Sequence, residues 1–144
     1  MRLDITALQE WVGRTHTVED IVTPRLLASF GATLGDHAAQ TAEGAAPPGL
    51  HWCLTPAIAD RRELGPDGHP AKGSFLPPVP LPRRMWAASD VRFMAPIRSG
   101  DRIRRRSTLT AIEEKQGRSG PLTFVTVRHD IANDSDPVIE AAEQ

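Results

Sequence analysis

The sequence lacks several features that would point to a particular class of protein. It has no tyrosine, 5% aromatic residues, a single cysteine (Cys53) and a formal net charge of −1. One cysteine excludes an intramolecular disulfide and is typical of a reducing compartment. A net charge this close to zero creates no broad basic surface, so we expect no nucleic-acid partner.

Long apolar runs are also missing. The N-terminal segment is amphipathic and charged where a signal peptide has an apolar core, and no stretch approaches the length of a membrane-spanning helix. We therefore expect a cytoplasmic protein that does not contact the membrane. With 144 residues, 40% of them hydrophobic, the chain can build one core, and we expect a single domain over residues 1–144.

Helical signals are confined to the first part of the chain. Asp4 is a candidate cap for a helix over residues 5–12, where apolar residues recur at helical spacing. Thr23 followed by Pro24 is a strong helix start and predicts a second helix over residues 24–34.

Irregular or extended chain separates these helices from the rest. Residues 15–22 are rich in β-branched side chains and are predicted to be extended, and residues 50–54 form a compact apolar piece that predicts a short helical turn. Residues 65–82 are dense in proline and glycine, which excludes a regular element there. A loop of this length is usually functional or disordered.

The C-terminal part has the alternation of a sheet. Strands are predicted around residues 91–93, 103–112, 122–131 and 138–139, with turns at 96–101, 116–120 and 133–136. Helices first and antiparallel strands afterwards indicate the α+β class.

Three stretches resemble one protein superfamily. In residues 93–103 a strand ends at Pro96 and a Gly-Asp turn leads into the next strand, which resembles the hairpin of MaoC-type hot-dog domains. Residues 67–87 and 115–129 are similar to the branch that holds the methylfumaryl-CoA and mesaconyl-C4-CoA hydratases and the mitochondrial-type hydroxyacyl-thioester dehydratases. The resemblance covers the chain from about Thr15 onward. It implies a hot-dog fold, an antiparallel sheet wrapped around a central helix.

Members of this branch are normally double hot-dogs about twice as long, and this sequence resembles their first half. Their catalytic pair lies in a Gly-Asp-x-Asn-Pro-x-His motif, normally in the second hot-dog. One group of the pair acts as a base on water and the other delivers a proton to the alpha carbon.

Residues 35–41 occupy the matching place in this sequence. Asp36 is present, but alanines replace the asparagine and the proline, and Thr41 stands at the histidine position. Threonine does not act as a base near neutral pH, and His37 follows Asp36 directly, so its side chain should point elsewhere. We therefore expect this motif to be non-catalytic, with Asp36 a weak candidate acid and more plausibly a turn residue.

Candidate substrate-binding residues lie elsewhere. Arginines beside a tryptophan after the proline-rich loop suggest a lined pocket or an interface, and a glycine-flanked turn offers amides to a phosphate or to pantetheine, unless it only joins two strands. The candidates are Arg83, Arg84, Met85 and Trp86 after the loop, and Arg118 and Gly120 in the turn.

Other polar residues permit a weaker interpretation. Arg102, Arg104 and Arg106 share one strand face, which is either a solvated surface or a seat for the phosphates of CoA. The five histidines have no paired short spacing and only one cysteine to join them, so we expect no metal site and solvated or hydrogen-bonded imidazoles.

The resemblance implies a function. The chain is expected to be a subunit, or the N-terminal half, of an acyl-CoA hydratase or dehydratase that acts on mesaconyl-CoA or a related enoyl thioester. The substrate is a CoA or acyl-carrier thioester, with no separate cofactor. A second hot-dog subunit is expected to supply the catalytic Asp/His pair, in a heteromer rather than a homodimer. Two alternatives stay open, a non-catalytic acyl-CoA-binding homodimer and a hot-dog thioesterase that uses Asp36.

Overall fold

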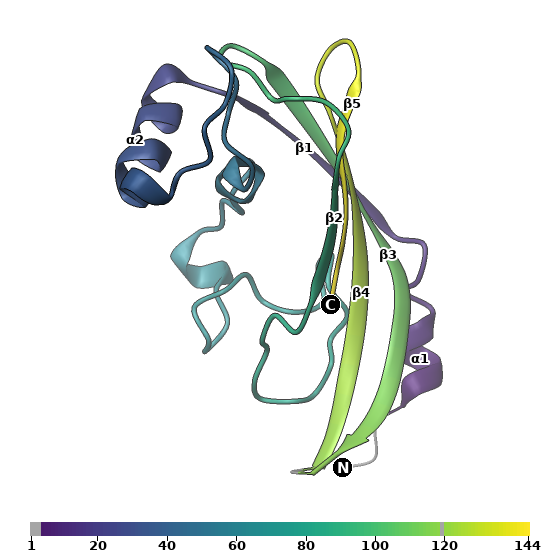
Figure 1. Cartoon of the computed structure of the whole chain (residues 1–144). Helices are drawn as coiled ribbons and strands as arrows, with labels where there is room; N and C mark the ends of the chain where they lie inside the picture. Colours follow the sequence, from purple (N-terminus) through teal and green to yellow (C-terminus); the bar gives the residue numbers. More distant parts are fainter. Residues whose placement is uncertain (1–3, 119) are drawn as a thin grey trace.

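A computed structural model describes residues 4–118 and 120–144 and contains one antiparallel sheet (Figure 1). Its strands are β1 (Thr15–Ile21), β2 (Ser89–Phe93), β3 (Arg102–Gly117), β4 (Gly120–Ala132) and β5 (Pro137–Glu143). They lie in the order β1-β3-β4-β5-β2, so β1 and β2 are the edges. Figure 1 shows a curved sheet with α2 and the irregular segment that follows it on the same face. The predicted α+β class is confirmed.

The helices begin where the sequence places them. Asp4 caps α1 (Ile5–Gln9), which ends earlier than predicted, and the Thr23 side chain accepts a hydrogen bond from the Leu26 amide at the start of α2 (Pro24–Leu34). The 3₁₀ turns are η1 (Gly35–His37), η2 (Leu50–Cys53) and η3 (Arg61–Glu63). In the part of the chain that is described, no helix is long and apolar enough to cross a membrane.

The last strand is longer than the sequence predicts. A strand was expected at residues 138–139, but β5 continues to Glu143 through a Glu-Ala-Ala-Glu stretch that has little strand propensity. Pairing with β4 on one side and β2 on the other overrides that propensity. Ala141, in the middle of the stretch, is 1% exposed. The predicted 116–120 turn starts too early, because Gln116 and Gly117 still pair in β3, and residue 119 of that turn lies outside the described residues.

One hydrophobic cluster attaches the irregular segment to the sheet. Leu50 and Leu54 are fully buried there, and Phe30 of α2 packs against the same cluster. Burial of a leucine side chain contributes about 1.5–3 kcal/mol. The buried members are Val22, Leu50, Leu54, Ile97, Ile103, Ile131, Val138, Ile139 and Ala141.

A pair of polar contacts, called here the Thr55 clamp, fixes the chain just after η2 to β1 and β3. The Thr55 amide donates to a carboxylate oxygen of Asp20 at 2.7 Å, and the Thr55 carbonyl accepts from the Arg105 guanidinium at 3.0 Å. Thr55 has a φ of +52°, a left-handed conformation that is unusual for threonine. These two partners hold the chain in that conformation.

A second clamp joins η2 to the sheet through Glu143. The Trp52 indole N–H donates to one oxygen of Glu143 at 3.1 Å, and the other oxygen lies 3.4 Å from Nε2 of His129. Nδ1 of His129 lies 2.7 Å from the Ser107 hydroxyl. The hydrogen bond to His129 lowers the pKa of Glu143, and the hydrogen bond from Trp52 lowers it further. Partial burial acts in the opposite direction and raises this pKa.

The proline-rich segment 65–82 has no helix or strand, as predicted, but it is folded on itself by specific contacts. Arg84 forms two hydrogen bonds with the carboxylate of Asp67, at 2.7 and 2.9 Å, and a third with the Pro70 carbonyl at 3.0 Å. The ammonium group of Lys72 donates to the carbonyls of Val79 and Leu81. Arg84 lowers the pKa of Asp67 and keeps it ionised.

We predict that Arg84→Ala loosens this loop without unfolding the sheet. The Gly65 and Ala71 amides, which donate to carbonyls within residues 63–69, should exchange with solvent about threefold to tenfold faster, while exchange in β3 and β4 is unchanged. The neighbouring exposed Arg83→Ala is the control, and hydrogen exchange by NMR is the measurement. Equal protection in the two variants would show that the Arg84–Asp67 pair does not hold the loop.

We also predict that Glu143→Gln removes a pH-dependent part of the stability. Because the folded pKa of Glu143 is lowered, its contribution is complete above the unfolded pKa and is lost as the pH falls through the folded pKa. At pH 7 the free energy of unfolding should fall by about 1 kcal/mol, and the difference from wild type should shrink as the pH is lowered from about 6 to about 3.

Denaturant unfolding at several pH values measures this difference. Glu140→Gln is the matched control, since Glu140 is a half-exposed carboxylate on the same strand that pairs with Arg128, and the change should stay within about 0.5 kcal/mol. A Glu143→Gln difference that is constant across the pH range would contradict the clamp.

Candidate functional site

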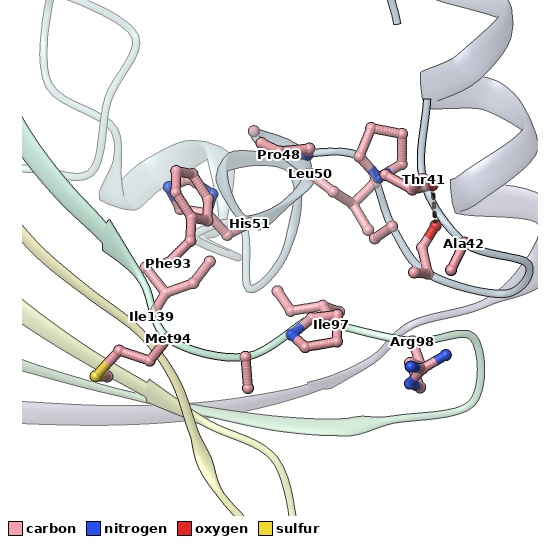
Figure 2. A pocket seen from close by; sticks show the side chains of 16 residues that line it. Thr41, Ala42, Pro48, Leu50, His51, Phe93, Met94, Ile97, Arg98 and Ile139 are labelled. Carbon is pink, nitrogen blue, oxygen red and sulfur yellow. Dashed lines mark hydrogen bonds between the residues drawn. The ribbon is translucent and has the colours of Figure 1, made fainter. Parts of the chain in front are cut away.

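A cavity of about 380 Å³ lies between the segment that follows η1 and the segment that leaves β2 (Figure 2). Its surface is mostly apolar. The floor is formed by three buried side chains, Leu50, Ile97 and Ile139. The lining residues are Thr41, Ala42, Ala45, Ala46, Pro47, Pro48, Gly49, Leu50, His51, Phe93, Met94, Ala95, Pro96, Ile97, Arg98 and Ile139.

Backbone hydrogen bonds join the two walls at one end. The Ala46 amide donates to the Ile97 carbonyl at 2.7 Å, and the Ser99 amide donates to the Gly44 carbonyl at 2.9 Å. Ala45 and Arg98 form an isolated antiparallel bridge between these contacts. The walls are therefore held at a fixed separation although neither belongs to the main sheet there.

His51 is the unusual polar group of the cavity. It is 4% exposed, and neither ring nitrogen has a hydrogen-bond partner within the described structure. Its ring lies 4.4 Å from the Trp52 ring and 5.7 Å, edge to face, from the Phe93 ring. An unpaired buried polar group costs about 1–3 kcal/mol, so its presence needs an explanation.

Burial lowers the pKa of His51, and the nearby Glu143 opposes this effect. The imidazole is thus neutral at pH 7, with one N–H donor and one acceptor nitrogen. A neutral imidazole at the wall of an apolar cavity suits a polar but uncharged group of a ligand. Both nitrogens are covered in this structure, so such a contact requires the ring to turn toward the cavity.

This finding corrects one expectation from the sequence. The five histidines were expected to be solvated or hydrogen-bonded, and His51 is neither. The signal available was its position inside an apolar run, residues 50–54, in which a solvated side chain is improbable. Among the described residues no group of His, Cys, Asp and Glu side chains is arranged to hold a metal ion.

The structure separates the two residues of the degenerate motif that correspond to the catalytic pair, Asp36 and Thr41. Asp36 is exposed in η1 and does not line the cavity, whereas Thr41, which stands at the histidine position of the resembling motif, does. The Thr41 hydroxyl donates to the Ala45 carbonyl at 2.9 Å, as Figure 2 shows. Thr41 thus stabilises the wall of the cavity.

The residues predicted after the proline-rich loop have different surroundings. Trp86 is 61% exposed and its ring meets Trp52 edge to face at 5.6 Å; the Trp52 ring in turn contacts His51, so Trp86 does not itself line the cavity. Met85 is exposed beside it. Arg84 is engaged in the loop contacts described above, and Arg83 is exposed.

The predicted turn residues Arg118 and Gly120 lie far from the cavity. They are at the tip of the β3–β4 hairpin, at the opposite end of the sheet from the cavity walls (Figure 1). Arg102, Arg104 and Arg106 alternate with the buried Ile103 and Ser107, so they lie on the outward face of β3. This agrees with a solvated face. Arg102 lies 3.6 Å from Glu19 of β1.

Comparison with solved structures shows the fold. The ChsH1–ChsH2 complex from Mycobacterium tuberculosis matches over 96% of this chain and 89% of the compared chain, with a TM-score of 0.65 and 14% identity. The R-hydratase PhaJ1 from Pseudomonas aeruginosa matches over 92% and 78%, with a TM-score of 0.58 and 18% identity. A MaoC-like dehydratase from Rhodospirillum rubrum matches over 92% and 89%, with a TM-score of 0.55 and 17% identity. The predicted hot-dog fold is confirmed.

Comparison of sequences identifies the family. A mesaconyl-C(4)-CoA hydratase from Chloroflexus aurantiacus is 43% identical over 122 residues, which are 84% of this chain and 44% of that protein. The chain thus spans less than half the length of this curated relative. The family model for the FAS1-like dehydratase domain region matches residues 10–141. The chain belongs to the family of FAS1-like dehydratase domain regions, within the MaoC-like hot-dog superfamily.

Proposed function

We propose that this chain is the acyl-binding hot-dog of an acyl-CoA hydratase or dehydratase, which adds water to, or removes it from, an enoyl thioester such as mesaconyl-CoA. The observation that carries the proposal is the apolar cavity with the neutral, unpaired His51 in its wall. The sequence similarity to a mesaconyl-C(4)-CoA hydratase supports the reaction class. In this proposal the acyl chain lies against the apolar walls, and the His51 ring turns so that one of its nitrogens, both covered in this structure, donates to the thioester carbonyl.

The catalytic acid and base are expected from a second hot-dog domain. Adding water across an enoyl thioester needs one group to take a proton from water and one to protonate the alpha carbon. The described lining residues do not form such a pair. Its described lining contains no carboxylate, and Asp36 lies outside it. A partner that carries the intact Asp/Asn and His pair completes the chemistry, in a heteromer rather than a homodimer.

An exposed apolar surface next to the cavity favours the binding of such a partner. Met85 and Trp86 are 84% and 61% exposed, and Phe93 and Met94 are each 51% exposed. Phe93 and Met94 also line the cavity, and β2 is an edge strand with one side unpaired in the sheet. An exposed apolar surface beside an open strand edge is typical of a protein interface. A second hot-dog on this surface would bring its catalytic pair toward the cavity.

Two alternatives are less well supported. A thioesterase that uses Asp36 requires a bound acyl group next to an exposed carboxylate outside the cavity. A non-catalytic acyl-CoA-binding homodimer would use the same cavity and His51. Turnover assays distinguish the homodimer from the proposed hydratase, because only the hydratase, together with its partner, consumes enoyl-CoA.

We predict that the purified chain binds enoyl-CoA but does not hydrate it. Co-expression with a hot-dog domain that carries the intact Gly-Asp-x-Asn-Pro-x-His motif should give hydration of mesaconyl-CoA, measured as loss of the enoyl-thioester absorbance. An inactive variant of the partner's catalytic aspartate is the control. Robust hydration by the isolated chain would contradict a partner-supplied catalytic pair, and binding without turnover in either form would favour the homodimer.

We predict that His51→Phe weakens binding without weakening the fold. Phenylalanine keeps the ring contacts with Trp52 and Phe93 and removes two unpaired buried nitrogens, so stability should be unchanged or higher. The lost donor should weaken enoyl-CoA binding about fivefold to tenfold by calorimetry. The exposed His37→Phe is the control. If binding is unchanged in His51→Phe, His51 does not contact the ligand.

A further inference from the structure

Strand β2 is an edge of the sheet and pairs with β5 on one side only. Just before the strand, Ala88 and Gln144 exchange two backbone hydrogen bonds, at 3.3 and 2.9 Å. In a regular antiparallel pair such exchanges recur at every second residue. The amides and carbonyls of Ser89, Val91 and Phe93 therefore point away from β5, and the open edge offers these backbone groups to another strand.

Two residues of opposite charge flank the centre of this strand. Asp90 and Arg92 are exposed on the outward face of the sheet, where they line a shallow groove of about 180 Å³ together with Arg128 and Glu140. Arg128 and Glu140 pair with each other at 3.1 Å. Within residues 4–118 and 120–144, neither Asp90 nor Arg92 forms an ion pair. Both charges are therefore available to a strand that pairs with β2.

The order of these charges is self-complementary in one register. Charges on an edge strand often prevent pairing, but they do so where like charges meet, because opposite charges on facing residues attract. If two copies of β2 align antiparallel with Val91 at the centre, Asp90 of each copy lies opposite Arg92 of the other. Moving the centre by one residue places two like charges opposite each other, and moving it by two residues leaves both charges without a charged neighbour.

The backbone favours the same register. With Val91 at the centre, the outward amides and carbonyls of Ser89, Val91 and Phe93 face those of the other copy and form ladder hydrogen bonds. Asp90 and Arg92 then make the non-hydrogen-bonded pairs, whose Cα atoms are about 4.5 Å apart and whose side chains are closest. On the inner face the half-exposed side chain of Phe93 meets the second copy and loses contact with water.

We propose that a second copy of this chain binds the open edge of β2, with reciprocal Asp90–Arg92 ion pairs that fix the register at Val91. The same strand serves both copies, so the interface has twofold symmetry. This inference goes beyond the proposed function and does not depend on it, because the pairing is a property of the chain without its catalytic partner. A catalytic hot-dog that uses this edge replaces the second copy, and to keep the register its edge strand carries an acidic residue two positions before a basic one.

Charge reversal tests the register. Analytical ultracentrifugation of the full chain over a concentration series should show a reversible equilibrium between monomer and dimer. Asp90→Arg and Arg92→Asp each place like charges at both ion-pair positions, so each change should weaken the dimer at least about tenfold. An equal mixture of the two variants again has opposite charges at both positions and should form a mixed dimer with about wild-type affinity.

Hydrogen exchange by NMR identifies the edge that is used. The amides of Ser89, Val91 and Phe93 should become protected as the wild-type concentration rises, whereas those of Asp90 and Arg92, which point toward β5, should be protected at every concentration. The control is a change of Arg104→Asp, an exposed residue of β3 in the interior of the sheet, which should leave dimer affinity and exchange in β2 unchanged.

Several results would overturn the inference. Wild type that stays monomeric at every concentration contradicts the homodimer, and a dimer that forms without protection of Val91 uses another surface. If both charge-reversed variants dimerise as tightly as wild type, or if their mixture stays monomeric, the register is wrong. None of these results bears on acyl binding, since no thioester is present. Asp90 and Arg92 are exposed, so circular dichroism spectra identical to wild type are expected for both variants.

Discussion

Attachment of residues 50–55 to the inner face of the sheet is the constraint on which the site depends. Leu50 and Leu54 supply the apolar part of this attachment, and they are buried among residues from β3, β4 and β5. Two polar clamps fix the orientation, one at Thr55 and one at Glu143. His51 lies between these anchors, so its ring is held at the cavity wall although its own nitrogens bond to no described residue. The surrounding contacts offset the cost of that unpaired group.

Much of the fold was predictable because local signals and tertiary pairing agree. The cap residues Asp4 and Thr23 place both helix starts, and alternation in the C-terminal half predicts β3 and β4. The end of β5 was not predictable, since its alanines and glutamates favour a helix and become a strand only through neighbours on both sides. The cavity itself depends on the bridge between Ala45 and Arg98, which are more than fifty positions apart in sequence.

The candidate site was only partly predictable. Trp86 was expected near a pocket; it does not line the cavity, and its ring meets edge to face that of Trp52, which packs against the lining residue His51. His51 carried no motif. Its importance comes from its burial and from the lack of a described hydrogen-bond partner, and these are properties of the folded chain alone. Arg118 and Gly120 resembled a binding turn in sequence, but the length of the β3–β4 hairpin carries them to the far end of the sheet.

An NMR titration with a thioether analogue of an enoyl-CoA, which cannot be hydrated or hydrolysed, tests most directly whether the cavity holds the acyl group. We predict that backbone amide shifts concentrate at Leu50, His51, Ile97 and Arg98, with smaller changes around Trp86. Shifts confined to Asp36, or to the hairpin tip at Arg118, with an unperturbed His51 would contradict it.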